Sequence, residues 1–181
     1  MIIRPVEAHE IPALAALASK TYAEAFGASM SAADLAAQLS ATRSESYFTN
    51  ALRQDTILVA VGDSALVGYV QLSDVRIPIA EAKPSDQELF ALYVRSDHQG
   101  KGVGKTLMDA AFAHDRLKRA RKVWLDVWDA NARAIALYTR YGFRPAGRRD
   151  VMVDGKVIGS DLVMARAVAK PELRVRQDGA T

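Results

Sequence analysis

One stretch of the sequence sets the architecture of the chain, and it reads Glu88-Leu-Phe-Ala-Leu-Tyr-Val-Arg-Ser-Asp-His-Gln-Gly-Lys-Gly-Val-Gly-Lys-Thr-Leu-Met108. Its first seven residues are mostly apolar without alternation, which is typical of a central strand buried on both faces. Three alternate glycines, Gly100, Gly102 and Gly104, then lead into a helical pattern. Glycine lets a bound group approach the backbone closely, and a helix N-terminus adds free N–H donors and partial positive charge. The stretch therefore predicts a site for phosphate or pyrophosphate.

The spacing of these glycines distinguishes between known phosphate-binding loops. A nucleotide P-loop needs a glycine five positions before Gly104, where this chain has Gln99. The dinucleotide pattern G-x-G-x-x-G fails from either of the first two glycines, because Lys105 and Leu107 occupy the position of its third glycine. The pattern that fits is Q-x-x-G-x-G over residues 99–104. It resembles the acetyl-CoA pyrophosphate loop of the GNAT superfamily of N-acetyltransferases.

A second segment strengthens this resemblance. Residues 131–143 read Asn-Ala-Arg-Ala-Ile-Ala-Leu-Tyr-Thr-Arg-Tyr-Gly-Phe and are similar to the family pattern N-x-x-A-x-x-x-Y-x-x-x-G-F. The resemblance covers residues 2–166. It implies the GNAT fold, an α/β (α+β) architecture with a mixed, mostly antiparallel sheet of about seven strands, a central parallel pair, and helices on both faces.

The order of the predicted elements agrees with that fold. We expect strands over 2–6, 56–61, 65–72, 88–94, 123–128, 143–153 and 157–164. We expect helices over 9–26, 44–52, 102–119 and 131–141, and a further helix that begins at a Ser31 cap. Gly27 is the expected stop of the first helix, and Asp154-Gly155 is the expected turn of the last hairpin. Residues 73–86 are expected to form an irregular connection. We expect one domain over 1–166 and a polar tail over 167–181.

The composition excludes several kinds of chemistry. The 181 residues carry 24 basic and 21 acidic side chains, a net charge of +3, and no cysteine, which excludes disulfides, thiolate metal sites and an enzyme cysteine nucleophile. The three histidines are scattered without metal-ligand spacing, so we expect no metal. Basic residues gather late in the chain, which favours a solvated surface over nucleic-acid binding. A cationic rim that attracts the phosphates of CoA is the sharper alternative.

The ends and apolar runs of the sequence bear on its location. Residues 1–5, Met-Ile-Ile-Arg-Pro, lack the apolar core of a signal peptide, and no apolar run approaches the ~20 residues of a membrane span. We therefore expect a cytoplasmic protein with no membrane partner. The sequence leaves open whether the protein forms a homodimer.

Two residues are predicted to carry the chemistry that the resemblance implies. An acceptor ammonium has a pKa near ~10.4 and must lose a proton before attack. Glu88 is the predicted base, directly or through water, because a catalytic glutamate lies eleven positions before the loop glutamine in the histone-acetylating members that the sequence resembles. The alternative is a strand-end glutamate in a surface ion pair, or one that only orients a water. Tyr138 matches the family's tyrosine beside the CoA sulfur and is the predicted acid, the alternative being a ring packed on the sheet.

The resemblance also implies an acetyl-CoA site. The end of the strand at 92–94 is expected to splay from its neighbour and bind the pantetheine arm through its backbone, with the Val94 N–H as oxyanion donor. Asn131 is expected to bond the pantetheine, to cap the helix that follows, or both. The predicted acetyl-CoA-binding residues are Leu92, Tyr93, Val94, Gln99, Gly100, Lys101, Gly102, Val103, Gly104, Lys105, Asn131 and Tyr138.

Three further segments bear on the acceptor, which we expect to be a small-molecule amine. Residues 88–94, 124–128 and 161–164 resemble the Pai-type spermidine/spermine acetyltransferase branch, which implies a polyamine. That branch usually has glycine where this chain has Asp126, which either binds a cationic acceptor or is a hydrogen-bonded structural residue. The alternatives are a protein N-terminus, an amino acid analogue or an aminoglycoside. In a different class, the chain is a non-catalytic acyl-CoA-binding regulatory module.

Overall fold

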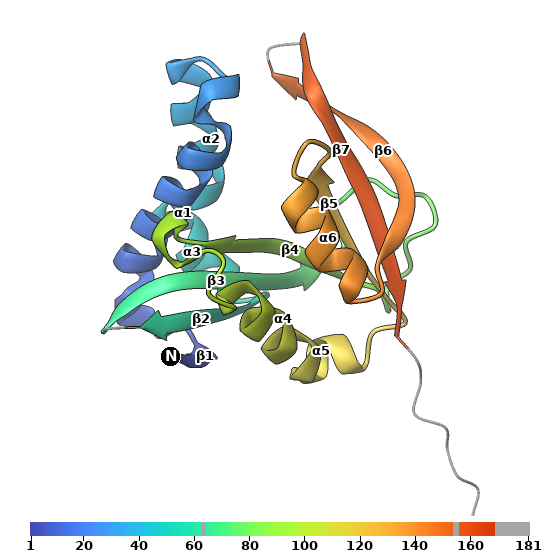
Figure 1. Ribbon diagram of the computed structural model, residues 1–181, viewed down its shortest axis with the longest axis horizontal. Coiled ribbons are helices and arrows are strands. Elements are labelled where there is room, and N and C mark those ends of the chain that lie inside the picture. The colour runs from blue at the N-terminus through green and yellow to red at the C-terminus, as the bar shows by residue number, and fades with distance from the viewer. Residues whose placement is uncertain (63, 154–155, 169–181) are drawn as a thin grey trace, which may run out of the picture.

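Seven strands form one mixed sheet in the order β1-β2-β3-β4-β5-β7-β6 (Figure 1). The computed structural model describes residues 1–62, 64–153 and 156–168. The strands are β1 (Ile2–Pro5), β2 (Thr56–Gly62), β3 (Ala65–Asp74), β4 (Gln87–Val94), β5 (Lys122–Trp128), β6 (Arg144–Val153) and β7 (Lys156–Ala167). Neighbouring strands are antiparallel except for β4 and β5, which are parallel. The predicted mixed sheet with one central parallel pair is therefore confirmed.

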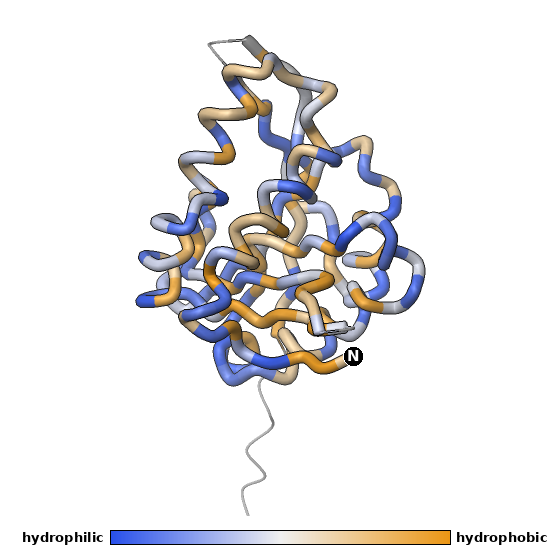
Figure 2. The backbone as a smooth tube through the Cα atoms, turned by 90° about the vertical axis from the view of Figure 1, so that its left-hand side faces the viewer, coloured by the Kyte–Doolittle hydropathy of each residue, from blue (hydrophilic) through white to orange (hydrophobic). Residues whose placement is uncertain are grey.

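Helices cover both faces of this sheet, as predicted. They are α1 (Ile11–Phe26), α2 (Ala32–Arg43), α3 (Glu45–Ala51), α4 (Val103–Ala113), α5 (Asp115–Lys118) and α6 (Ala132–Arg140). Strand residues alternate between the faces, so Ile57 and Val59 of β2 pack with α1 and α3, while Leu58 and Ala60 pack with α4 and α5. Strands β2, β3 and β5 are buried on both sides, whereas β6 is exposed over residues 144–150. Figure 2 shows hydrophobic stretches along the backbone.

Helix ends follow the sequence with two differences. Ser31 caps α2 by accepting the N–H of Asp34 at 3.1 Å, as predicted. The helix expected over 102–119 is wrong, because the chain is extended at His114 and the Nδ1 of that residue accepts the N–H of Arg116, which starts α5. Leu117 of α5 remains in the same core as α4, so one apolar period runs through the break. Gly27 follows the last residue of α1, but it is right-handed and continues into a short 3-10 turn instead of terminating the helix in a left-handed conformation.

The irregular connection over 75–86 takes the place of a helix on one part of the sheet. Its Ile77 is buried against Trp124 and Val163. Asp86 is also buried, where its Oδ2 accepts the indole N–H of Trp124 at 3.0 Å and the guanidinium of Arg121 at 2.6 Å. The connection is irregular as predicted, but it is shorter than the predicted 73–86, because Ser73 and Asp74 belong to β3. These contacts hold it over β5 and β7.

The last hairpin is formed by β6 and β7, as predicted. Its expected turn at Asp154-Gly155 lies outside the described residues, as do residues 169–181 of the expected tail. β7 extends to Ala167, and the N–H of Val168 donates to the carbonyl of Arg121 at 3.1 Å, so ordered structure passes the expected boundary at 166. No helix in the described ranges combines the length and apolar character that a membrane crossing requires.

Candidate active site

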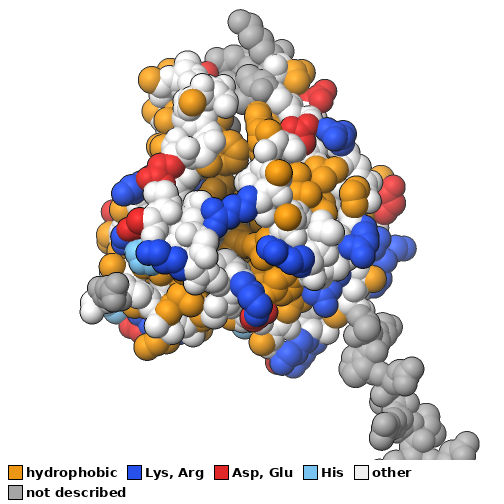
Figure 3. All heavy atoms as spheres, viewed as in Figure 1, with side chains coloured by type: hydrophobic (Ala, Val, Ile, Leu, Met, Phe, Trp, Pro, Cys, Tyr) orange, Lys and Arg blue, Asp and Glu red, His pale blue; other side chains and the backbone are white. Residues whose placement is uncertain are grey.

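The central parallel strands separate almost as soon as they meet. β4 and β5 pair only at Gln87 with Val123 and at Glu88 with Trp124. Beyond these two pairs a cavity of about 680 Å³ opens, lined by β4, the end of β5, the glycine loop, α1 and α6. Figure 3 shows Lys and Arg side chains gathered around the hollow on this face. The splay that the sequence predicted is present, and it leaves strand edges facing the cavity.

Glu88 lies at the closed end of this gap. Its side chain is 2% exposed, and its Oε2 accepts the backbone N–H groups of Arg76 at 2.5 Å and Ile77 at 3.1 Å. Burial raises the pKa of Glu88, and the two N–H donors oppose that rise only in part. Glu88 lines the cavity, and its Oε1 accepts no bond from the described residues. The surface ion pair considered as an alternative is wrong.

The backbone of β4 presents alternate amides to the cavity. The N–H of Arg95 donates to the carbonyl of Val67 at 2.9 Å, so the backbone amide of Arg95 points toward β3. Because backbone amides alternate in direction along a strand, the amide of Tyr93 also points toward β3, whereas the amides of Leu92 and Val94 point into the gap. The carbonyl of Val94 points the same way and accepts from the Gln99 side chain at 3.1 Å. The predicted backbone role therefore fits Leu92 and Val94 and is wrong for Tyr93, whose ring lines the cavity instead.

The glycine loop presents a run of free amides at the start of α4. Gly100 and Gly102 have φ of 80° and 84°, which glycine adopts without strain. The first amide to donate into the helix is that of Thr106, which reaches the carbonyl of Gly102 at 3.0 Å. Within the described ranges no acceptor meets the N–H groups of residues 100–105. Six successive free amides at a helix N-terminus fit a pyrophosphate.

Side chains around the loop divide into those that line the cavity and those that do not. Gln99 also accepts from Nη1 of Arg133 on α6 at 3.0 Å, so it joins the end of β4 to that helix. Lys105 and Arg133 line the cavity. The predicted residues Lys101 and Val103 are not among those that line the cavity, because Lys101 is exposed outside it and Val103 is buried in the core.

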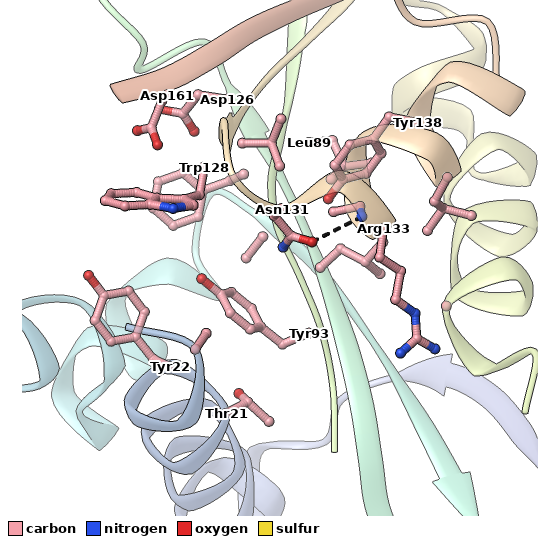
Figure 4. A pocket seen from close by; sticks show the side chains of 18 of the residues that line it. Thr21, Tyr22, Leu89, Tyr93, Asp126, Trp128, Asn131, Arg133, Tyr138 and Asp161 are labelled. Atoms are coloured by element: carbon pink, nitrogen blue, oxygen red, sulfur yellow. Dashed lines mark hydrogen bonds between the residues drawn. The ribbon is translucent and has the colours of Figure 1, made fainter. Parts of the chain in front are cut away.

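Tyr138 and Asn131 come from α6 and the turn before it. The ring of Tyr138 is buried against Phe143, with ring centroids 5.9 Å apart, and Figure 4 shows it beside the cavity. Burial, then Tyr93 and Asp126, raise the pKa of Tyr138, which keeps the phenol protonated. The Oδ1 of Asn131 accepts the N–H of Ala134 at 3.1 Å, so its predicted cap is confirmed (Figure 4).

A second wall of the cavity carries two carboxylates. Asp126 of β5 and Asp161 of β7 both accept from Nη2 of Arg149, the second at 3.2 Å. Burial and the nearby Asp126 raise the pKa of Asp161 to about 6. Figure 4 shows both carboxylates beside Trp128, with Tyr22 of α1 across the cavity. Asp126 is thus both hydrogen-bonded and part of the cavity wall.

The sequence did not bring together several of these residues, although the segments 124–128 and 161–164 were among those that resemble the Pai-type branch. Asp161 joins Asp126 only through the pairing of β5 with β7. Tyr22, Phe26 and Trp128 form an aromatic wall, with centroids 4.8 Å and 5.9 Å apart in succession. Arg43, the last residue of α2, is buried and also lines the cavity. No signal in the sequence links these distant segments. No group of three or more metal-ligating side chains is found in the part of the chain that the structure describes.

Comparison with known proteins agrees with this geometry. A sequence model of the Acetyltransferase (GNAT) family matches residues 13–143. An uncharacterized N-acetyltransferase of Mycobacterium tuberculosis is 32% identical over 157 residues, which cover 84% of this chain and 94% of that protein. The spermine/spermidine N(1)-acetyltransferase of Bacillus subtilis is 34% identical over 63 residues, which cover 34% of this chain and 41% of that protein.

The fold has a similar counterpart among solved structures. The PaiA N-acetyltransferase from Thermoplasma acidophilum, in complex with coenzyme A, aligns with a TM-score of 0.73 at 21% identity, covering 92% of this chain and 98% of that chain. The family match spans most of the sequence and includes β4, the glycine loop and α6. The predicted resemblance is confirmed: the chain belongs to the acetyltransferase (GNAT) family, has the GNAT fold and is an N-acetyltransferase.

Proposed function

We propose that the chain transfers an acetyl group from acetyl-CoA to a primary amine by direct attack of the amine on the thioester. The observation that carries the proposal is the buried carboxylate of Glu88 at the closed end of a gap between two strands. Bound acetyl-CoA supplies the thioester carbonyl and the thiol leaving group. The free amides of residues 100–105 would hold its pyrophosphate, and the edge at Leu92 and Val94 would pair with its amide-rich arm.

Each proposed catalytic group has one task. Glu88 accepts a proton from the acceptor ammonium at Oε1, directly or through a water, and its raised pKa makes the carboxylate a stronger base. The N–H of Val94 stabilises the negative charge that develops on the carbonyl oxygen. Tyr138 donates its proton to the departing sulfur, whose own pKa near ~8.5 makes this help useful but not essential.

The carboxylates of Asp126 and Asp161 would attract the acceptor amine. Two carboxylates share one guanidinium, so this wall keeps an excess negative charge. A polyamine is one candidate, supported by the partial similarity to the spermine/spermidine enzyme. A protein N-terminus, an amino acid analogue and an aminoglycoside contain the same reactive group. All are small-molecule or peptide amines, the class of acceptor on which GNAT acetyltransferases act.

An amine panel tests the proposal. Purified protein is mixed with acetyl-CoA and one amine from each class, and release of free CoA thiol is followed. We expect thiol release that depends on at least one amine, with an acetylated product of matching mass. Release that never depends on an amine, together with no rise in melting temperature on adding acetyl-CoA, would contradict it.

A further inference from the structure

Arg43 places a buried positive charge in the acceptor half of the cavity. Its side chain is 8% exposed, at the C-terminal end of α2. The guanidinium carbon lies 4.5 Å from the ring centroid of Tyr22 and 5.6 Å from that of Tyr93. One Nη donates to the Tyr93 hydroxyl at 3.5 Å, and the other donates to the carbonyl of Thr42 at 3.1 Å. Arginine remains protonated in proteins, so this charge is permanent.

All of these partners are neutral. No carboxylate of the described residues lies within 4.0 Å of the Arg43 guanidinium, and its Nε is buried without a hydrogen-bond partner. A buried charge is costly unless an opposite charge and hydrogen bonds compensate for it. By contrast, Arg76 and Arg149 on the same cavity each pair with a carboxylate. Arg133 and Arg140 also line the cavity without a carboxylate partner among the described residues, but both are exposed to solvent. Among the cavity arginines of the described residues, Arg43 is therefore the buried one whose surroundings suit an added anion.

The cavity is consequently dipolar. Asp126 and Asp161 line the same cavity, and Figure 4 shows the rings of Tyr22 and Tyr93 across it from these two carboxylates. Arg43 lies against both rings. Tyr93 contacts Arg43 and is also close enough to both carboxylates for them to influence its pKa, which burial raises. A ligand with an ammonium at one end and an anion at the other would match both walls at once. A simple polyamine offers nothing to Arg43.

Resting on the proposed acetyl transfer, we propose that the acceptor is a small amine that also carries a carboxylate, and that Arg43 binds this carboxylate. A planar guanidinium is complementary to a planar carboxylate and forms strong charge-assisted hydrogen bonds with it. The ammonium end then lies on the side of Asp126 and Glu88, where the proton is removed. Arg43 is a specificity-determining residue and takes no part in the proton transfers.

Matched amine pairs test this inference. Glycine, β-alanine, 4-aminobutyrate and 6-aminohexanoate are each compared with the alkylamine that lacks the carboxylate, and spermidine is included as a polyamine. We expect kcat/KM to favour the carboxylate member of at least one pair by about tenfold or more. The best chain length reports the distance from the reacting amine to Arg43. Alkylamines or spermidine as the better substrates throughout would overturn the inference.

Variants separate recognition from folding. Arg43→Met should abolish the preference within a pair while retaining turnover of the alkylamine, and Arg43→Lys should retain part of it. An equal fall for both members of every pair would mean that Arg43 only supports the fold. If no amine is acetylated, the proposed function fails, and binding then tests Arg43 alone. In that case N-acetylated carboxylates should raise the wild-type melting temperature more than N-acetylalkylamines, and equal shifts would overturn the inference.

Discussion

Replacing Glu88 with glutamine removes the proposed base while keeping the shape of the side chain. Its Oε2 accepts the N–H groups of Arg76 and Ile77, and the amide oxygen of glutamine can accept the same two bonds. The connection over 75–86 should therefore stay in place. A positioned general base typically contributes about 10²–10⁴-fold. We expect kcat/KM to fall by at least roughly 10²-fold, which corresponds to about 2.7 kcal/mol of transition-state free energy.

The same substitution, which lowers activity, is expected to preserve or raise the stability of the fold. Burial raises the pKa of Glu88 above its ordinary value of 4.5, so the folded state binds more protons than the unfolded state between these two pKa values. The free energy of unfolding then decreases as pH rises through that window, and the loss persists above it. Glutamine carries no charge and avoids this loss. At pH 7 we expect Glu88→Gln to melt at the wild-type temperature or above it.

Initial rates of thiol release across mildly acidic to alkaline pH provide the assay. Wild type should lose activity on the acid side as Glu88 is protonated, and the variant should lack that limb of the profile. Glu81→Gln is the matched control, because Glu81 is an exposed glutamate in the connection over 75–86, which donates the two N–H groups to Glu88. Wild-type turnover and an unchanged acid limb in Glu88→Gln would refute the role of Glu88 as the base.

Three other substitutions probe the walls of the site. Tyr138→Phe should lower kcat by no more than the roughly 10²-fold at the low end for a general acid, because a thiolate already leaves readily, and should not change the melting temperature, because the ring stays packed; equal kcat at every pH would exclude an acid role. Gly68→Ala should lower the free energy of unfolding by about 1–3 kcal/mol in denaturant titrations, because its Cβ would lie 2.9 Å from the carbonyl of Tyr93; unchanged stability would show that β3 and β4 can separate at low cost. Gly159→Ala would place a Cβ against the Trp128 ring, so we expect KM for the amine to change while the affinity for CoA stays the same; the reverse pattern would place Trp128 on the cofactor side.

The parts of the site that the sequence predicts well are local ones. The glycine loop depends on the spacing of residues within one turn, and Asn131 caps the helix that starts at the next residue. The splay of β4 followed from the family resemblance. These features need no knowledge of distant segments. The backbone role predicted for Tyr93 was wrong, because the pairing of β4 with β3 decides which amides of β4 face the gap.

The parts that the sequence does not predict depend on chain segments that meet only in the folded protein. The donors to Glu88 come from the irregular connection, whose sequence shows no period that would place it. Arg43 ends a helix, where a basic residue is common because it complements the helix dipole, so nothing indicates its burial. The break at His114 was missed because the apolar period passes through it. The common cause is tertiary packing that local patterns do not encode.

The early separation of β4 and β5 has a consequence for how this sheet avoids unwanted association. Unpaired strand edges at the border of a sheet are templates on which other chains add strands and aggregate. Here two such edges lie inside the molecule, in a cavity walled by α1 and α6. We expect these enclosed edges to exclude a foreign strand with bulky side chains on both faces, while the slender amide-rich arm of acetyl-CoA would fit between them. The fold would thus reserve unpaired strand edges for a small molecule and shield them from other polypeptides.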